Sequence, residues 1–151
     1  MKKVFLGLVL IVVFVCFYYI YSSRNNFSSV IINGHEIKIE IMDTPAKQAQ
    51  GLSGHESLAE NSGMLFVFSK PARQNFWMKD MKFPIDIIWI RQTADGDRIV
   101  GFVENAPVPP STDGLETSLE IFSSPDNVYK VLEINAGLVK RWGIKVGDLV
   151  D

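Results

Sequence analysis

Two acidic side chains lie inside segments that have the pattern of β-strands, and these side chains have the clearest capacity for chemistry. Asp86 belongs to the apolar segment 84–90, and Glu133 belongs to the segment 131–137. Two carboxyl groups that flank a sugar ring can serve as the acid and the base of glycoside hydrolysis. Carboxyl groups can also accept hydrogen bonds from a bound ligand or from the protein itself. Asp86 and Glu133 are therefore candidates for a ligand site, for a hydrolase and for a structural role.

Strand alternation places Asp86 at the head of an apolar face. Side chains in a strand alternate between two faces, so Asp86 shares a face with Ile88, and Glu133 shares one with Val131 and Asn135. Asp86 either reaches water at the end of its strand or is buried and bonded to backbone amides or a lysine, because a buried carboxylate without partners is too costly. In the third interpretation it is one acid of a ligand pocket.

An aromatic and a basic side chain lie two residues apart just before this strand. Trp77 and Lys79 would share a face of an extended segment 75–80. A tryptophan beside a lysine suits stacking on a planar or sugar-like ligand, but it also suits packing, with the lysine stem laid over the ring. Pro84 cannot donate to a regular ladder, so 81–84 form a kinked corner that can border a pocket. The predicted ligand-binding residues are Trp77, Lys79, Asp86 and Glu133.

Other residue types argue against several functions. The formal net charge of −2 lacks the basic excess that nucleic-acid binding requires. The one cysteine, Cys16, lies in an apolar run, which excludes a disulfide within the chain and disfavours a thiolate nucleophile. His35, His55 and the methionines lack metal-ligand spacing, and the sequence contains no phosphate loop, dinucleotide fingerprint or G-x-S-x-G elbow. We therefore predict no catalytic residue, cofactor or metal site.

Short strands separated by turn signals must position the candidate residues. Asn33-Gly34 predicts a hairpin, and 43–51 carry a capping residue, an early proline and a final glycine, which predict a short helix. A single helical turn is predicted at 138–143 and a turn at 69–74. Further strands are predicted at 63–68, 75–80, 84–90, 98–106, 128–137 and 144–151.

This pattern predicts a mainly β, compact, jelly-roll-like sandwich or barrel with one or two short helices. The segment 107–127 contains four prolines and forms a long loop. Long loops in compact domains often carry function, so this loop is a candidate lid over the ligand site.

The N-terminus has the pattern of a membrane anchor. Residues 4–21 are uncharged and almost wholly apolar, and eighteen residues in a helix span roughly 27 Å, close to the thickness of the bilayer hydrocarbon. Lys2 and Lys3 favour a cytoplasmic N-terminus, which would place the rest of the chain in the periplasm or outside the cell. Bulky residues at the cleavage positions favour an uncleaved anchor over a removed signal peptide. We predict an anchor at 1–21, a polar linker at 22–29 and a β domain at 30–151.

Several segments carry a resemblance to a known family. The chain resembles the family known as domain of unknown function 192 from about Ile32 to its C-terminus. The segments that carry the resemblance are GLSGHESLAENSGMLFVF, FWMKDMKFPIDIIWI, ENAPVPP, VLEINAG and WGIKVGDLV. The family pattern has asparagine after the lysine, often followed by threonine, where this chain has Asp80 and Met81. The early Gly-Leu-Met motif of the family is Gly51-Leu52-Ser53 in this chain.

The resemblance implies a mainly β domain of jelly-roll-like character that is often exported or tethered to a membrane, and it implies no agreed activity. The leading interpretation is a membrane-anchored, non-enzymatic domain that binds a small polar or carbohydrate-like envelope ligand or a partner protein. The first alternative is an envelope hydrolase that uses Asp86 and Glu133 as a carboxylate pair. The second is a structural module whose exposed strand edge takes a partner strand.

Overall fold

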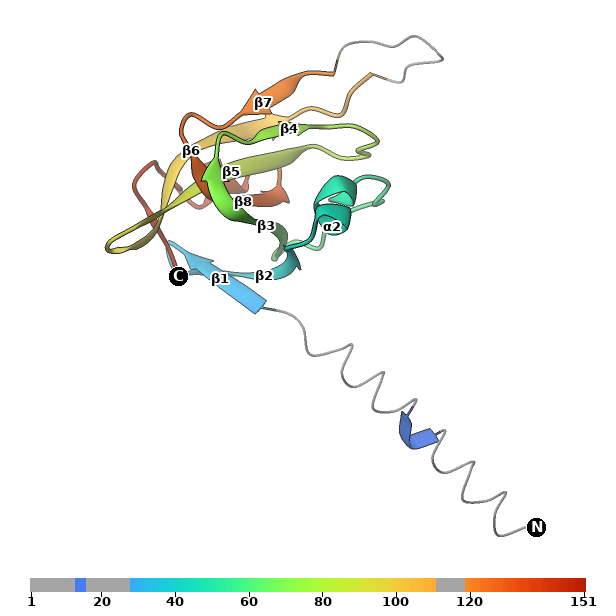
Figure 1. Cartoon of the computed structure of the whole chain (residues 1–151). Coiled ribbons are helices and arrows are strands. Elements are labelled where there is room, and N and C mark those ends of the chain that lie inside the picture. The colour runs from blue at the N-terminus through green and yellow to red at the C-terminus, as the bar shows by residue number, and fades with distance from the viewer. Residues whose placement is uncertain (1–12, 16–27, 111–118) are drawn as a thin grey trace, which may run out of the picture.

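The computed structural model describes residues 13–15, 28–110 and 119–151 (Figure 1). Val13, Phe14 and Val15 are helical, and the other residues of the predicted anchor and most of the predicted linker lie outside the described part of the chain. Among the residues that the structure describes, no helix is both long enough and apolar enough to cross a bilayer.

Seven strands form one sheet that curls into a nearly closed barrel (Figure 1). Their order in the sheet is β1-β2-β3-β8-β5-β6-β9. All pairings are antiparallel except that of β2 with β3. The backbone of Ile31 in β1 exchanges two hydrogen bonds, of 2.7 and 3.0 Å, with that of Asp151 beside β9, and these bonds close the barrel. The strands are β1 (Ser28–Ile32), β2 (His35–Met42), β3 (Ser62–Ala72), β5 (Ile85–Thr93), β6 (Gly96–Ala106), β8 (Val128–Asn135) and β9 (Leu149–Val150).

The predicted hairpin is confirmed at Asn33-Gly34. Both residues have positive φ, 51° and 80°, as a tight two-residue turn between twisted strands requires. The turn sets the register of β1 and β2, so the alternating isoleucines of β2 face inward. The two predicted helices are also present, as α2 (Pro45–Gln50) and α3 (Leu138–Arg141).

The barrel interior is an apolar cluster with contributions from all seven strands and from α3. Leu138 and Val139 of α3 and the following Ile144 belong to this cluster, together with residues of the strands. The strand residues of the interior are Val30, Ile32, Ile37, Ile39, Leu65, Ile88, Ile90, Ile99, Leu132, Ile134 and Val150.

A second apolar cluster covers the outer face of β3, β8 and β5. It includes Phe66, Ile87, Trp89 and Val131, whose sequence neighbours belong to the interior cluster. This face is apolar because α2, the loop after it and a small second sheet lie over it. The small sheet pairs β4 (Asn75–Trp77) with β7 (Ile121–Ser123) in antiparallel fashion (Figure 1).

Four local predictions differ from the structure, and the first is the strand predicted at 144–151, of which only Leu149–Val150 (β9) is a strand. The predicted turn at 69–74 is wrong for residues 69–72, because β3 continues to Ala72. The predicted strand at 75–80 is limited to 75–77 and belongs to the small sheet rather than the barrel. The predicted loop at 107–127 contains β7, and its residues 111–118 lie outside the described residues.

Candidate functional site

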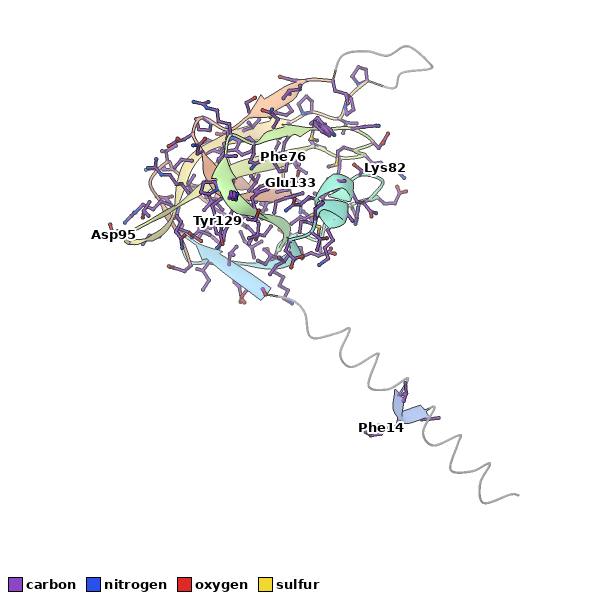
Figure 2. All side chains as sticks on the ribbon, in the orientation of Figure 1. Phe14, Phe76, Lys82, Asp95, Tyr129 and Glu133 are labelled. Carbon is purple, nitrogen blue, oxygen red and sulfur yellow. The ribbon has the colours of Figure 1, made fainter. Side chains whose placement is uncertain are left out.

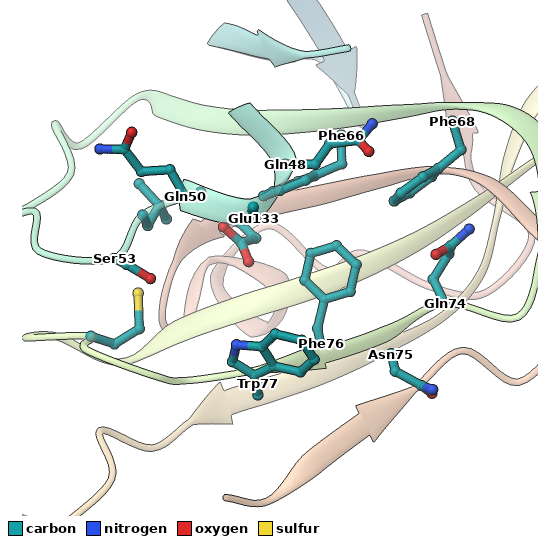
Figure 3. Close-up of a pocket in the computed structure, with 14 residues that line it drawn as sticks. Gln48, Gln50, Ser53, Phe66, Phe68, Gln74, Asn75, Phe76, Trp77 and Glu133 are labelled. Atoms are coloured by element: carbon teal, nitrogen blue, oxygen red, sulfur yellow. The ribbon is translucent and has the colours of Figure 1, made fainter. Parts of the chain in front are cut away.

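A pocket of about 300 Å³ lies between α2 and the small sheet, over the outer face of the barrel (Figure 3). Its walls come from α2 and the loop that follows it, from β3 and from β4, and its floor contains Glu133 of β8. The lining residues are Gln48, Ala49, Gln50, Gly51, Leu52, Ser53, Phe66, Phe68, Gln74, Asn75, Phe76, Trp77, Met81 and Glu133.

Helix α2 is fixed in place as one wall of this pocket. The Thr44 side chain caps its first turn by accepting a hydrogen bond from the Lys47 amide at 3.4 Å. The side-chain amide of Gln48 donates to the backbone carbonyls of Met42 and Val67, at 3.1 and 2.9 Å. These two bonds tie the helix to the C-terminal end of β2 and to the middle of β3.

The helix ends at Gly51, which lies against an aromatic ring of the pocket. Gly51 has φ of +49°, a conformation that side chains other than glycine rarely adopt. A Cβ at this position would lie 3.2 Å from the ring of Phe66. The glycine therefore lets the chain turn closely over the pocket.

Two hydrogen bonds hold the loop after α2 to the residues that follow β4. The Ser53 hydroxyl donates to the carbonyl of Lys79, and the Gly54 amide donates to the carbonyl of Asp80, both at 2.9 Å. Asp80 itself has φ of +57°, so the chain turns sharply at this contact. The two contacts join opposite walls at one end of the pocket.

Aromatic rings form much of the apolar surface of the pocket. The ring of Phe76 meets that of Phe66 edge-on at a centroid distance of 4.9 Å, and it meets that of Trp89 beneath the pocket at 5.5 Å. Trp77 is 53% exposed, so its ring stands at the rim. Figure 3 shows Phe76 and Trp77 on one side of the Glu133 carboxyl group and Gln50 of α2 on the other.

Glu133 is the buried polar group of this pocket. Its residue is 6% exposed, and its Oε2 has no hydrogen-bond partner among the described residues. Burial disfavours the charged form and raises the pKa of the Glu133 carboxyl from 4.5 to about 8. At neutral pH the group is therefore mostly a neutral acid. Figure 2 shows Glu133 inside the body of the domain, whereas Lys82 lies at its surface.

Asp86 lies on the opposite face of the same sheet. Its carboxylate accepts hydrogen bonds from three backbone amides, those of Asn105 at 2.9 Å, Gly137 at 3.0 Å and Val139 at 2.8 Å. These bonds fasten the start of α3 to the barrel. The fully buried side chain of Asp86 is thus satisfied within the protein, as one of its three sequence interpretations required.

The structure brings together two of the four predicted site residues. Trp77 and Glu133 line the pocket, whereas Lys79 is exposed beside it and contributes its backbone carbonyl to the Ser53 contact. Ile87, not Asp86, is the register partner of Glu133, so the two carboxyl groups point to opposite faces of the sheet. The structure does not bring the proposed carboxylate pair together.

The sequence offered no sign of the polar and aromatic residues that α2 and β3 contribute. The predicted helix contains Gln48 and Gln50, and the predicted strand 63–68 contains Phe68. Local sequence patterns do not indicate that this helix lies over β8. No residue of the predicted lid that the structure describes, 107–110 or 119–127, lines the pocket. In the described ranges, no group of three or more His, Cys, Asp or Glu side chains could hold a metal ion.

Comparisons with known proteins give the family and two similar crystal structures. The family model DUF192, whose description begins "Uncharacterized ACR", matches residues 28–151. A protein of unknown function from Novosphingobium aromaticivorans DSM 12444 has 31% identity and a TM-score of 0.70, over 83% of this chain and 84% of that chain. A "putative transcription regulator" from Sinorhizobium meliloti 1021 has 31% identity and a TM-score of 0.68, over 83% and 94%. No curated protein matches the chain.

Proposed function

The chain belongs to the DUF192 family, and we propose that it is a binding protein that takes a small polar ligand into the pocket above Glu133. The apolar run at 4–21 and the lysines before it support a domain on the outer side of a membrane, and on that proposal the ligand is one of the cell envelope or its surroundings. Trp77 stacks on the ligand at the rim, and Glu133 makes the polar contact at the floor.

The observation that carries this proposal is the unpartnered Oε2 of Glu133 at the floor of an open pocket. A buried polar atom without a hydrogen bond costs free energy, about 1 to 3 kcal/mol for a typical group. A methionine or leucine at this position would bury no polar atom and would carry no such cost. A ligand that completes the hydrogen bonding of the carboxyl group accounts for the presence of an acid there.

The composition of the pocket supports the same proposal. Ligand pockets are concave, mostly apolar and lined with aromatic rings, and a small number of polar groups fix the orientation of the ligand. This pocket joins three phenylalanines and Trp77 to one acid and a few amide side chains. Its volume of about 300 Å³ matches a small molecule.

Binding by the full chain in detergent micelles tests the proposal, with a panel of neutral sugars and small amines as probes and calorimetry as the readout. Trp77→Ala removes the stacking ring but little of the core, because half of the side chain is exposed. We expect at least one probe to bind the wild type and to lose most of its affinity in this variant. Lys79→Ala is the matched control, since it changes an exposed residue of the same segment outside the pocket. Binding that is equal in all three proteins, or absent from the wild type, would contradict the proposal.

A further inference from the structure

We infer that the polar group recognised by this pocket is a primary ammonium, with the Glu133 carboxylate as its counter-charge and the surrounding rings as its apolar enclosure. This inference rests on the proposed function and deepens it, because it names the chemical class of the ligand.

The charge of the lining residues favours a cation over an anion. Glu133 is the one ionisable side chain among the fourteen residues that line the pocket, which include no lysine, arginine or histidine. An anionic ligand would therefore meet no opposite charge at the floor. An ammonium would meet a buried carboxylate, where water screens the attraction less than it does at the surface.

The charged side chains of the neighbouring elements do not line the pocket. Asp86 lies on the opposite face of the sheet, and Lys79 and Asp80 are exposed beside the pocket. The salt-bridge pairs around the site are Lys47 with Asp43, Lys82 with Glu56, Arg141 with Glu60 and Lys130 with Asp97. His55, in the loop after α2, does not line the pocket. Among the described residues, no lysine, arginine or histidine lines the pocket, so none takes the place that we assign to the ligand.

The hydrogen bonds already made by Gln48 and Ser53 leave oxygen acceptors that suit a ligand with hydrogen-bond donors. Both side-chain N–H groups of Gln48 donate to backbone carbonyls, and the Ser53 hydroxyl donates to the Lys79 carbonyl. Those two side chains retain oxygen lone pairs, which accept, and Glu133 as a carboxylate also only accepts. A primary ammonium carries three donors and no acceptor, so it can bond to these oxygens, while the side-chain amides of Gln50, Gln74 and Asn75 can donate to an acceptor elsewhere on the ligand.

The aromatic rings of the pocket also favour a cationic ligand. Trp77, Phe66, Phe68 and Phe76 line the space around the carboxyl group. The negative face of an aromatic ring attracts a cation within about 6 Å of the ring centre, and tryptophan does so most strongly. The rings also enclose the alkyl chain that carries the ammonium.

Binding of a cation requires the Glu133 carboxyl to lose its proton. The free acid is mostly protonated below its pKa of about 8, so each ammonium that binds at neutral pH displaces about one proton. As the pH is raised toward that pKa, the association constant increases about tenfold per pH unit. Above the pKa it no longer changes with pH. A neutral ligand that accepts a hydrogen bond from the protonated acid would show the opposite trend.

Calorimetry on the full chain in detergent micelles tests this inference with butylammonium chloride and 1-butanol as a charged and neutral pair. Sodium chloride at the same ionic strength serves as the reference. We expect butylammonium to bind about tenfold more tightly at pH 7 than at pH 6. We also expect its heat of binding to differ between phosphate and Tris buffers, since these take up the released proton with different enthalpies. The Glu133→Gln variant should lose both the pH dependence and most of the affinity, and Trp77→Ala should lose affinity with the pH dependence intact.

Three outcomes separate the inference from the proposed function. If 1-butanol or glucose binds in a way that depends on Trp77 and butylammonium does not, the ammonium is refuted while the binding function stands. If no probe of any charge binds the wild type, both fall. If butylammonium binds equally well to Glu133→Gln, the assignment of Glu133 as the counter-charge is wrong.

Discussion

The buried acid at the floor of the pocket makes the stability of the domain depend on pH in a direction that a conservative variant can test. Glu133→Gln keeps the size of the side chain and removes its titration. In the wild type, the folded protein holds the Glu133 proton up to a pKa of about 8, whereas the unfolded chain releases it near 4.5. Because the pKa is higher in the folded state, Glu133 ionises at lower pH in the unfolded chain, and this ionisation lowers the free energy of the unfolded state relative to the folded state. The contribution of Glu133 to stability therefore falls as the pH rises from about 4.5 to about 8 and is constant outside that window.

The size of this effect follows from the two pKa values. Between pH 5 and pH 8 the free energy of unfolding of the wild type should fall by about 3 kcal/mol more than that of Glu133→Gln. For a domain of this length, that difference corresponds to a shift in melting temperature on the order of 10 °C. Other titrating groups are common to both proteins, so they cancel in the comparison.

Tryptophan fluorescence provides the assay, because Trp89 is 1% exposed and reports the loss of the core. Melting curves of both full-length proteins in the same detergent are recorded at intervals from pH 5 to pH 9. The wild-type midpoint should fall relative to that of the variant as the pH rises, and the two curves should run parallel above about pH 8. Midpoints that move in parallel over the whole range would refute the assignment of Glu133 as a buried, unpaired acid.

Two further predictions concern the residues that shape the fold around the site. The Asp86 carboxylate accepts three backbone hydrogen bonds, and Asp86→Asn would turn a side-chain NH2 group toward those backbone N–H groups. We expect the free energy of unfolding, measured by urea denaturation, to fall by about 3 kcal/mol. A fall below about 1 kcal/mol would mean that Asp86 does not anchor α3. Gly51→Ala combines a strained backbone conformation with a Cβ that would lie 3.2 Å from the Phe66 ring, so we expect a loss of about 1 to 2 kcal/mol by the same method. An unchanged denaturation midpoint for Gly51→Ala would show that the end of α2 is freer to move than the structure indicates.

Local sequence patterns predicted correctly those features of the fold that depend on residues adjacent in the chain. Asn33-Gly34 marked the hairpin because a tight turn needs positive φ at both positions. The helix that starts after Thr44 and ends at Gly51 was marked by its capping residues. Strand alternation also assigned Glu133 to the face of Val131, and this is the outer face on which the pocket lies.

The strand order and the surroundings of the site depend on contacts between segments that are far apart in the chain, and local patterns do not predict these contacts. Nothing in the sequence of β8 indicates that it lies between β3 and β5, or that α2 covers its outer face. The role of Asp86 likewise depends on α3, which begins more than fifty residues later in the chain. The short segment at Trp77 alternates like a strand of the main sheet, but its partner is β7, beyond the proline-rich loop. Pairing of this kind is decided by the packing of the whole domain.

Titration of the Glu133 carboxyl carbon by NMR, in the full chain with labelled glutamate, tests the central claim most directly. The Glu133→Gln variant identifies the signal. We expect a midpoint near 8 in the free protein and a lower midpoint when butylammonium is added, because a bound cation stabilises the carboxylate. A midpoint near the ordinary glutamate value of about 4.3, unchanged by butylammonium, would contradict it and would mean that Glu133 is neither buried without a partner nor part of a cation site.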